Sequence, residues 1–125
     1  MARTAILVVD DEAILCRAYC RLLAHLYEVD TAATAAEALT KVEARNYAAV
    51  LSDYHMPGEN GLWLLAQTRR LRPTTRRVLT SGGVVPDLEA HLGSGVVEYF
   101  IAKPVERDAL VEALEGRSTE RPRRG

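Results

Sequence analysis

The chain has 125 residues, of which 48% are hydrophobic and 26% charged, and its formal net charge is −1. These values describe one ordinary globular domain and exclude a strongly basic nucleic-acid-binding protein. No apolar run reaches the roughly 18 residues that cross a membrane, and the first residues lack the apolar region of a secretory signal. We therefore expect a cytoplasmic protein that binds neither membrane nor nucleic acid directly.

Short apolar runs alternate with helical patterns along the chain. The runs rich in β-branched residues predict five strands, at Ala5–Val9, Tyr27–Thr31, Ala48–Ser52, Arg77–Thr80 and Val96–Ile101. Apolar residues at helical spacing follow each strand and predict helices that start near Ala13, Thr34, Leu62, Asp87 and Val105. This alternation predicts an α/β fold, a doubly wound five-stranded parallel sheet with helices on both faces.

Some element ends are marked by local signals. Thr34 followed by Glu37 is the pattern of a capping box. The apolar stripe of the first helix extends to Leu26, and Pro73 requires the third helix to end before it. Residues 1–115 make up the predicted domain. Residues 116–125, GRSTERPRRG, form an Arg-rich tail with no apolar side chain other than proline, and we expect this tail to be disordered.

Two features elsewhere in the chain have simple structural explanations. Cys16 and Cys20 share one helix face, but no further ligands accompany them, so we interpret them as small apolar side chains near the core. The arginines around Pro73 are interpreted as a solvated loop, because no helix that could read a nucleic acid accompanies them.

Polar residues follow the predicted strands at the edge where parallel sheets bind ligands. They are Asp10 and Asp11 after the first strand, Asp53 after the third, Thr80 and Ser81 at the end of the fourth, and Lys103 after the fifth. Three of the six aspartates and one of the two lysines therefore meet at one edge. Lysine is notable in a chain with fourteen arginines, because it supplies a compact ammonium where arginine has a planar fork.

The charges at this edge predict a cation and a phosphoryl group. Three carboxylates and one ammonium sum to −2, which a divalent cation neutralises. Oxygen ligands of this kind suit Mg²⁺ or Mn²⁺. A free carboxylate beside a metal, a hydroxyl and a lysine is complementary to a phosphoryl group, which a carboxylate accepts as an acyl phosphate.

Together these residues resemble a response-regulator receiver domain, the phosphoacceptor of two-component signalling, over residues 4 to about 115. The resemblance rests on Asp10-Asp11, on Asp53 followed by Met56-Pro57-Gly58, on Ser81-Gly82 and on Lys103-Pro104. Ser81 lies 28 residues after Asp53, and Lys103 lies 22 after Ser81, both typical of the family. The resemblance implies the flavodoxin-like receiver fold and a signalling domain, not an enzyme, although phosphotransfer and slow dephosphorylation are self-catalysed.

The resemblance also implies a role for each site residue. Asp53 is the expected phosphoacceptor for a sensor histidine kinase or phosphotransfer protein. Asp11 is the expected direct Mg²⁺ ligand, Asp10 binds largely through water, and Asp53 and the His55 carbonyl complete the protein ligands. Lys103 pairs with the phosphoryl group. The Lys103-Pro104 bond is usually cis in this family.

The same family resemblance implies a conformational switch. Ser81 is expected to hydrogen-bond the phosphoryl group, and the space it leaves admits an aromatic side chain at Phe100. This remodels the surface of the fourth helix, fifth strand and fifth helix, which binds a downstream protein and could bring two copies of the chain together. Position 100 is a phenylalanine in this chain, where the family more often has a tyrosine. Thr80, the residue before Ser81, is the alternative candidate for the hydroxyl that binds the phosphoryl group.

Other interpretations are open at single residues. His55 either titrates near the acyl phosphate or is a solvated loop residue, and Trp63 is either an exposed partner contact or buried.

Other functions fit less well. A phosphatase of the haloacid dehalogenase type needs a second aspartate at the His55 position, and a flavin protein needs a phosphate-binding loop where Asp10 and Asp11 lie. A pseudo-receiver that only binds partners would lack one of the site residues. The sequence leaves open whether the domain is free-standing or part of a longer regulator.

Overall fold

The structure is a computed structural model that describes residues 3–117, so most of the predicted tail lies outside the described residues. Strands and helices alternate along the chain. The strands are β1 (Thr4–Val9), β2 (Tyr27–Ala32), β3 (Ala49–Asp53), β4 (Arg76–Ser81) and β5 (Tyr99–Ala102). The helices are α1 (Ala13–Leu23), α2 (Ala35–Ala44), α3 (Gly61–Leu71), α4 (Leu88–Ser94) and α5 (Arg107–Leu114).

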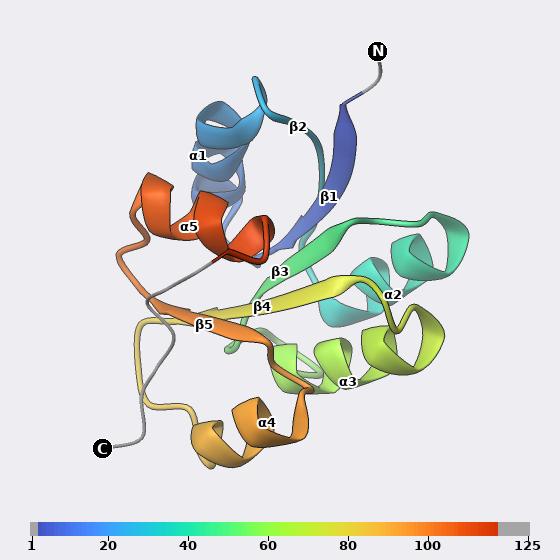
Figure 1. The fold of residues 1–125 in the computed structure, drawn as a ribbon, viewed down its shortest axis with the longest axis vertical. Coiled ribbons are helices and arrows are strands. Elements are labelled where there is room, and N and C mark those ends of the chain that lie inside the picture. The colour runs from blue at the N-terminus through green and yellow to red at the C-terminus, as the bar shows by residue number, and fades with distance from the viewer. Residues whose placement is uncertain (1–2, 118–125) are drawn as a thin grey trace.

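The five strands form one parallel sheet in the order β2-β1-β3-β4-β5. Figure 1 shows α1 and α5 on one face of this sheet and α2, α3 and α4 on the other. The predicted doubly wound parallel sheet is therefore confirmed, with the flavodoxin-like strand order. This order reverses between β1 and β3, so the carboxyl ends of these two strands flank the crevice where such sheets bind ligands.

Two apolar clusters, one on each face of the sheet, form the core. Leu7 and Val50 of the sheet pack with Leu64 of α3 on one face, while Val8 and Leu51 pack with Leu110 of α5 on the other. Adjacent residues of one strand thus serve opposite faces, because successive side chains alternate across a sheet. Strands that are buried on both faces account for the continuous apolar runs in the sequence.

Several element ends agree with the sequence and others differ from it. The capping box is confirmed, because the Glu37 amide donates to the Thr34 hydroxyl at 3.1 Å and the Glu37 carboxylate accepts from the Ala33 amide at 2.9 Å. Helix α1 ends at Leu23, before the predicted Leu26, which lies in the turn toward β2 and is 40% exposed. The apolar period alone did not distinguish the last helical turn from the turn that follows it.

The arginines around Pro73 are bound to the fold, so the interpretation of a solvated loop is wrong for most of them. Arg72 donates to the carbonyls of Val42 and Glu43, where α2 ends. Arg76 donates to the carbonyl of Leu114, where α5 ends. The last carbonyls of a helix lack intrahelical partners, and these guanidiniums satisfy them.

Among residues 3–117, no helix has the length and apolar character needed to cross a membrane.

Candidate functional site

The carboxyl ends of β1, β3 and β5 bring a lysine between two aspartates. Lys103 Nζ lies 3.1 Å from Asp10 Oδ2 and 3.1 Å from Asp53 Oδ1. Asp10 directly follows β1, Asp53 is the last residue of β3, and Lys103 directly follows β5. The peptide bond between Lys103 and Pro104 is cis. The sequence prediction that these strand ends meet at one edge of the sheet is therefore confirmed.

Asp10 and Asp11 are neighbours in the chain but differ in their surroundings. Asp10 is 1% exposed, and its second carboxylate oxygen accepts from the Glu12 amide at 2.9 Å. Asp11 is exposed. One carboxylate is thus fixed inside the fold, while the next can reach a ligand from the solvent side.

The three aspartates could hold a divalent cation. A carboxylate oxygen from each of Asp10, Asp11 and Asp53 lies within 4.8 Å of the others. Carboxylate oxygens are hard ligands of the type that Mg²⁺ and Mn²⁺ prefer, and a set of only three leaves room for water and substrate oxygens. The donor set therefore fits the predicted metal.

Burial and the ammonium of Lys103 shift the pKa of Asp53 in opposite directions. Burial raises the pKa of the Asp53 carboxyl above its ordinary value, and the Asp10 charge adds to this, while Lys103 lowers the pKa in part. Burial disfavours the charged form of Lys103, but its contacts with Asp10 and Asp53 outweigh that effect and raise the pKa of Lys103. The lysine therefore stays protonated, and the carboxylate of Asp53 is a stronger base than an exposed aspartate.

Ser81 and Thr80 end β4 and have different partners. The Ser81 hydroxyl donates to the Gly83 carbonyl at 3.1 Å and accepts from the Gly83 amide at 3.0 Å. The Thr80 hydroxyl interacts with the phenol of Tyr19 on α1. Ser81 is therefore bonded within the loop that follows β4, whereas Thr80 is engaged with the α1 face of the sheet.

The other predicted residues differ in how far their side chains are buried. His55 is exposed in the loop after β3, and its ring lies edge-on to that of Tyr54 with centroids 4.6 Å apart. Phe100 is partly buried and packs against the apolar cluster under α2, α3 and α4. Trp63 packs against the same cluster, which favours the buried interpretation over the exposed one.

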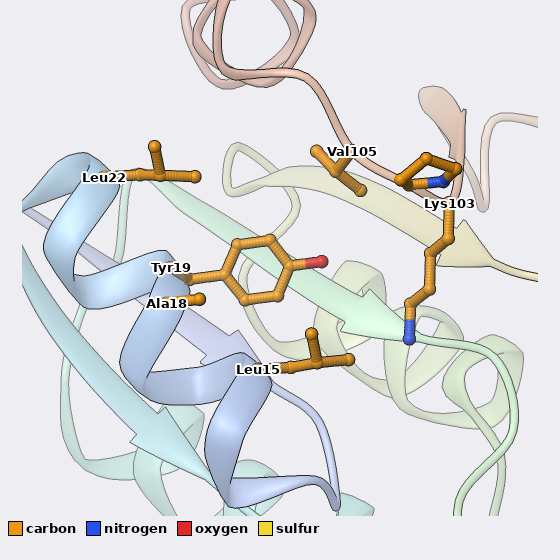
Figure 2. Close-up of a pocket in the computed structure, with 7 residues that line it drawn as sticks. Leu15, Ala18, Tyr19, Leu22, Lys103 and Val105 are labelled. Carbon is orange, nitrogen blue, oxygen red and sulfur yellow. The ribbon is translucent and has the colours of Figure 1, made fainter.

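An apolar groove of about 490 Å³ adjoins the site. Figure 2 shows Leu15, Tyr19 and Leu22 projecting from α1 toward Val105 and Lys103 across this groove. No pattern in the sequence by itself predicted the groove. Its signal is the apolar stripe of the first helix together with Pro104-Val105 after the lysine, a combination that becomes visible only when α1 is placed beside the loop that follows β5.

The sequence and fold match one family of proteins. A model of the response regulator receiver domain matches residues 6–115. The transcriptional regulatory protein GlrR of Escherichia coli is 34% identical over 88% of this chain and 25% of its own length. The transcriptional regulatory protein TcrA of Mycobacterium tuberculosis is 37% identical over 94% of this chain and 47% of its own length. The matched part of the chain thus corresponds to a quarter of the length of the first relative and to just under half the length of the second.

Solved structures show the same likeness. A CheY-like receiver domain protein from Methanospirillum hungatei superposes with a TM-score of 0.85 and 28% identity, covering 93% of this chain and 94% of that chain. The response regulator TrrA of Thermotoga maritima, solved in complex with Mg²⁺ and BeF, has a TM-score of 0.78 and 29% identity over 92% of this chain and 99% of its own.

Proposed function

Because the chain belongs to the response regulator receiver domain family, we propose that it accepts a phosphoryl group on Asp53 from a sensor histidine kinase or phosphotransfer protein. The reaction needs Mg²⁺ or Mn²⁺. The chain is a domain of a signalling protein and not a classical enzyme. In this proposal residues 1–115 act in the cytoplasm, where they meet the phosphoryl donor.

One observation carries the proposal. Lys103 Nζ lies 3.1 Å from the carboxylates of both Asp10 and Asp53, and these belong to the cluster of three aspartates. A structural ion pair needs one carboxylate for one ammonium. The excess of negative charge instead suits a site that binds a cation and then a phosphoryl group.

The side chains take the following roles. A carboxylate oxygen of Asp53 attacks the phosphorus atom, the bond from phosphorus to the histidine nitrogen of the donor breaks, and the imidazole leaves with its electron pair. Lys103 offsets charge on the phosphoryl oxygens, and the Ser81 hydroxyl donates to one of them. A divalent cation held by Asp11, Asp53 and the His55 carbonyl, with Asp10 contributing through water, would neutralise charge at the same oxygens.

The donor reaches Asp53 from the side of the groove. Ile14 is 70% exposed on the first turn of α1, next to the groove-lining Leu15. A large exposed apolar side chain beside an apolar groove is typical of a contact surface for a protein partner. We assign this surface to the phosphodonor because it adjoins Lys103 and lies on the opposite face of the sheet from α4.

The conformational switch begins from the hydrogen bonds that the Ser81 hydroxyl makes with Gly83 in the unphosphorylated protein. To donate to a phosphoryl oxygen, its hydroxyl must leave the Gly83 carbonyl. The loop after β4 then rearranges, and Phe100 moves into the vacated space. The surface of α4, β5 and α5 changes shape for a downstream protein, and two phosphorylated chains could pair through it.

The experiment is incubation with acetyl phosphate and Mg²⁺, followed by intact mass. We expect the wild-type protein to gain one phosphoryl group, and we expect Asp53→Asn, or EDTA in place of Mg²⁺, to prevent the gain. Asp108→Asn, at an exposed position of α5, is the matched control and gains the group normally. Equal modification of Asp53→Asn would contradict the proposal, as would a wild-type protein that is modified neither by acetyl phosphate nor by phosphorylated kinases.

A further inference from the structure

A single buried arginine holds the segment that connects α4 to β5. Arg77 is only 4% exposed. Its Nε donates to the Val96 carbonyl at 3.1 Å, and one terminal nitrogen donates to the Gly95 carbonyl at 2.9 Å. The other terminal nitrogen donates to the carbonyls of Pro73 and Thr75, at 3.2 and 2.9 Å. Four of the five N–H groups of the guanidinium thus bind main-chain carbonyls.

Glu98 completes this arrangement around Arg77. Its carboxylate lies 3.6 Å from the guanidinium and also accepts from the Arg77 main-chain amide at 2.9 Å. The Glu98 amide donates to the Arg77 carbonyl at 3.0 Å. Nearby, the guanidinium of Arg69 donates to the Ser94 carbonyl at 2.8 Å. The end of α4 and the residues just before β5 are therefore bound to β4 by several hydrogen bonds and a charge pair, and to α3 by one further hydrogen bond.

The other end of α4 is held much more weakly. Within residues 82–90 the only buried side chain is Val85, and α4 itself buries none. Asp87 precedes the helix with a φ of 56°, in the left-handed region that non-glycine residues adopt uncommonly, and its side chain makes no capping hydrogen bond. Val84 is 85% exposed. Each segment buries one side chain, Val85 before α4 and Val97 after it, so the difference lies in the hydrogen bonds that Arg77 and Arg69 give to residues 94–96. Because local stability follows such bonds, the segment before α4 opens more easily than the segment after it.

We infer that Arg77 is a positioning residue that fixes the C-terminal end of α4 and the start of β5. A rearrangement at Ser81, at the opposite end of the same strand, then moves the main chain of the β4–α4 loop and of the first half of α4, while the main chain of residues 94–98 stays in place and Phe100 changes only its side chain. Arg77 acts as the pivot of that motion. The inference rests on the proposed function, because phosphorylation of Asp53 is what moves Ser81.

The first test measures amide hydrogen exchange in the unphosphorylated protein. The variants are Arg77→Met, which keeps the bulk of the side chain, and Arg77→Lys, which keeps the charge. The control is Arg70→Met, because Arg70 is exposed and its guanidinium donates only to the side chain of Gln67 in the described chain. We expect the amides of Val97 and Glu98 to exchange about tenfold faster in Arg77→Met, less so in Arg77→Lys, and unchanged in the control.

The outcome separates a local role from general destabilisation. Wild-type exchange at residues 94–98 in Arg77→Met would overturn the inference. If Arg77→Met does not fold, Arg77→Lys decides by the same criterion: faster exchange confined to residues 94–98 supports the inference, and a uniform increase over all strands overturns it.

The second test repeats the exchange with acetyl phosphate and Mg²⁺. In the wild-type protein, we expect altered exchange in residues 82–90 and unchanged exchange in residues 94–98. In Arg77→Met the altered region extends to residue 98, while the gain of a phosphoryl group is the same. A change in the wild-type protein that is equally large in residues 94–98 overturns the pivot. If the wild-type protein gains no phosphoryl group, the proposed function fails, and the first test still decides whether Arg77 holds the segment.

Discussion

Gly61 lies against Asp53 so closely that a Cβ atom at Gly61 would come within 2.3 Å of the Asp53 carbonyl oxygen. The same atom would lie 2.9 Å from the Leu79 side chain and 3.0 Å from the Ser52 hydroxyl. The φ of Gly61 is not in the left-handed region, so glycine is needed here for space and not for backbone conformation. Helix α3 thus begins in contact with the strand that carries the proposed phosphoacceptor.

We therefore expect Gly61→Ala to lower the free energy of unfolding by about 1–3 kcal/mol, the usual cost of overpacking. It should also slow phosphorylation, because the clash displaces Asp53. Gly93→Ala is the matched control, since a Cβ at Gly93 meets nothing within 4 Å. It lies inside α4 and should stabilise the protein by about 0.5–1 kcal/mol through helix propensity. Urea unfolding of both variants checks the prediction, and equal effects would contradict it.

Asp11→Asn should stabilise the metal-free protein and abolish its response to Mg²⁺. Asp11 is the exposed member of the three aspartates, and removing its charge relieves repulsion worth about 0.5–1 kcal/mol near the surface. Saturating Mg²⁺ should raise the melting temperature of the wild-type protein, with about 2.7 kcal/mol of stabilisation at a hundred times the dissociation constant. Thermal melts with and without Mg²⁺ measure both effects. A wild-type protein that Mg²⁺ leaves unchanged would contradict this prediction.

Lys103→Met should slow phosphorylation from acetyl phosphate by about 100-fold, because the transferred group loses its positive partner. Asp10 also loses its counter-charge while it stays buried, so the variant should be less stable. Lys103→Arg restores the charge but places a planar fork between two carboxylates, and it should recover stability more than rate. The rates come from intact mass against time. A Lys103→Met protein that reacts at the wild-type rate would remove Lys103 from the mechanism.

The raised pKa of Asp53 predicts a particular pH dependence in metal-free protein. Its ordinary value is 3.8, and burial raises the pKa in the folded state. Between the unfolded and folded pKa values the folded protein binds more protons, so its stability falls as pH rises through that interval. Asp53→Asn removes this loss. Its stability advantage over the wild-type protein should therefore grow with pH and level off above the folded pKa.

Two measurements check the pH prediction. Urea unfolding in EDTA over a series of acidic pH values gives the stability difference between Asp53→Asn and the wild-type protein. The carboxyl ¹³C resonance of Asp53 gives its pKa directly, and we expect a midpoint above 3.8. A midpoint at or below that value would mean that the attraction of Lys103 exceeds the cost of burial.

The sheet and the centre of the site could be predicted from the sequence because both follow from local patterns. Apolar runs place the strands, and parallel strands align their carboxyl ends, so Asp10, Asp53 and Lys103 had to meet. The start of β5 was not predictable in this way. Val96 and Val97 look like strand residues, but Val96 is held by Arg77 from another strand, and β5 begins at Tyr99.

Arg77 itself shows why long-range contacts escape sequence patterns. In the sequence it is one of several arginines near a proline, and although it begins the fourth predicted strand, no local signal shows that its side chain is buried while that of Arg70 is exposed. Only the fold shows that the carbonyls of Gly95 and Val96 converge on its position. The groove beside Lys103 escaped prediction for the same reason, since its two walls come from opposite ends of the chain.

Arginines stabilise the end of the sheet that lies opposite the candidate site. Arg72, Arg76 and Arg77 bind helix ends and loop carbonyls at the amino ends of the strands, away from the three aspartates. Guanidiniums keep their charge at every pH where a carboxylate reacts, so this edge stays assembled while the opposite edge gains and loses protons, cations and phosphoryl groups. A protein engineer could therefore retune the lifetime of the signal at one edge and the heat resistance of the scaffold at the other, as two separate design problems.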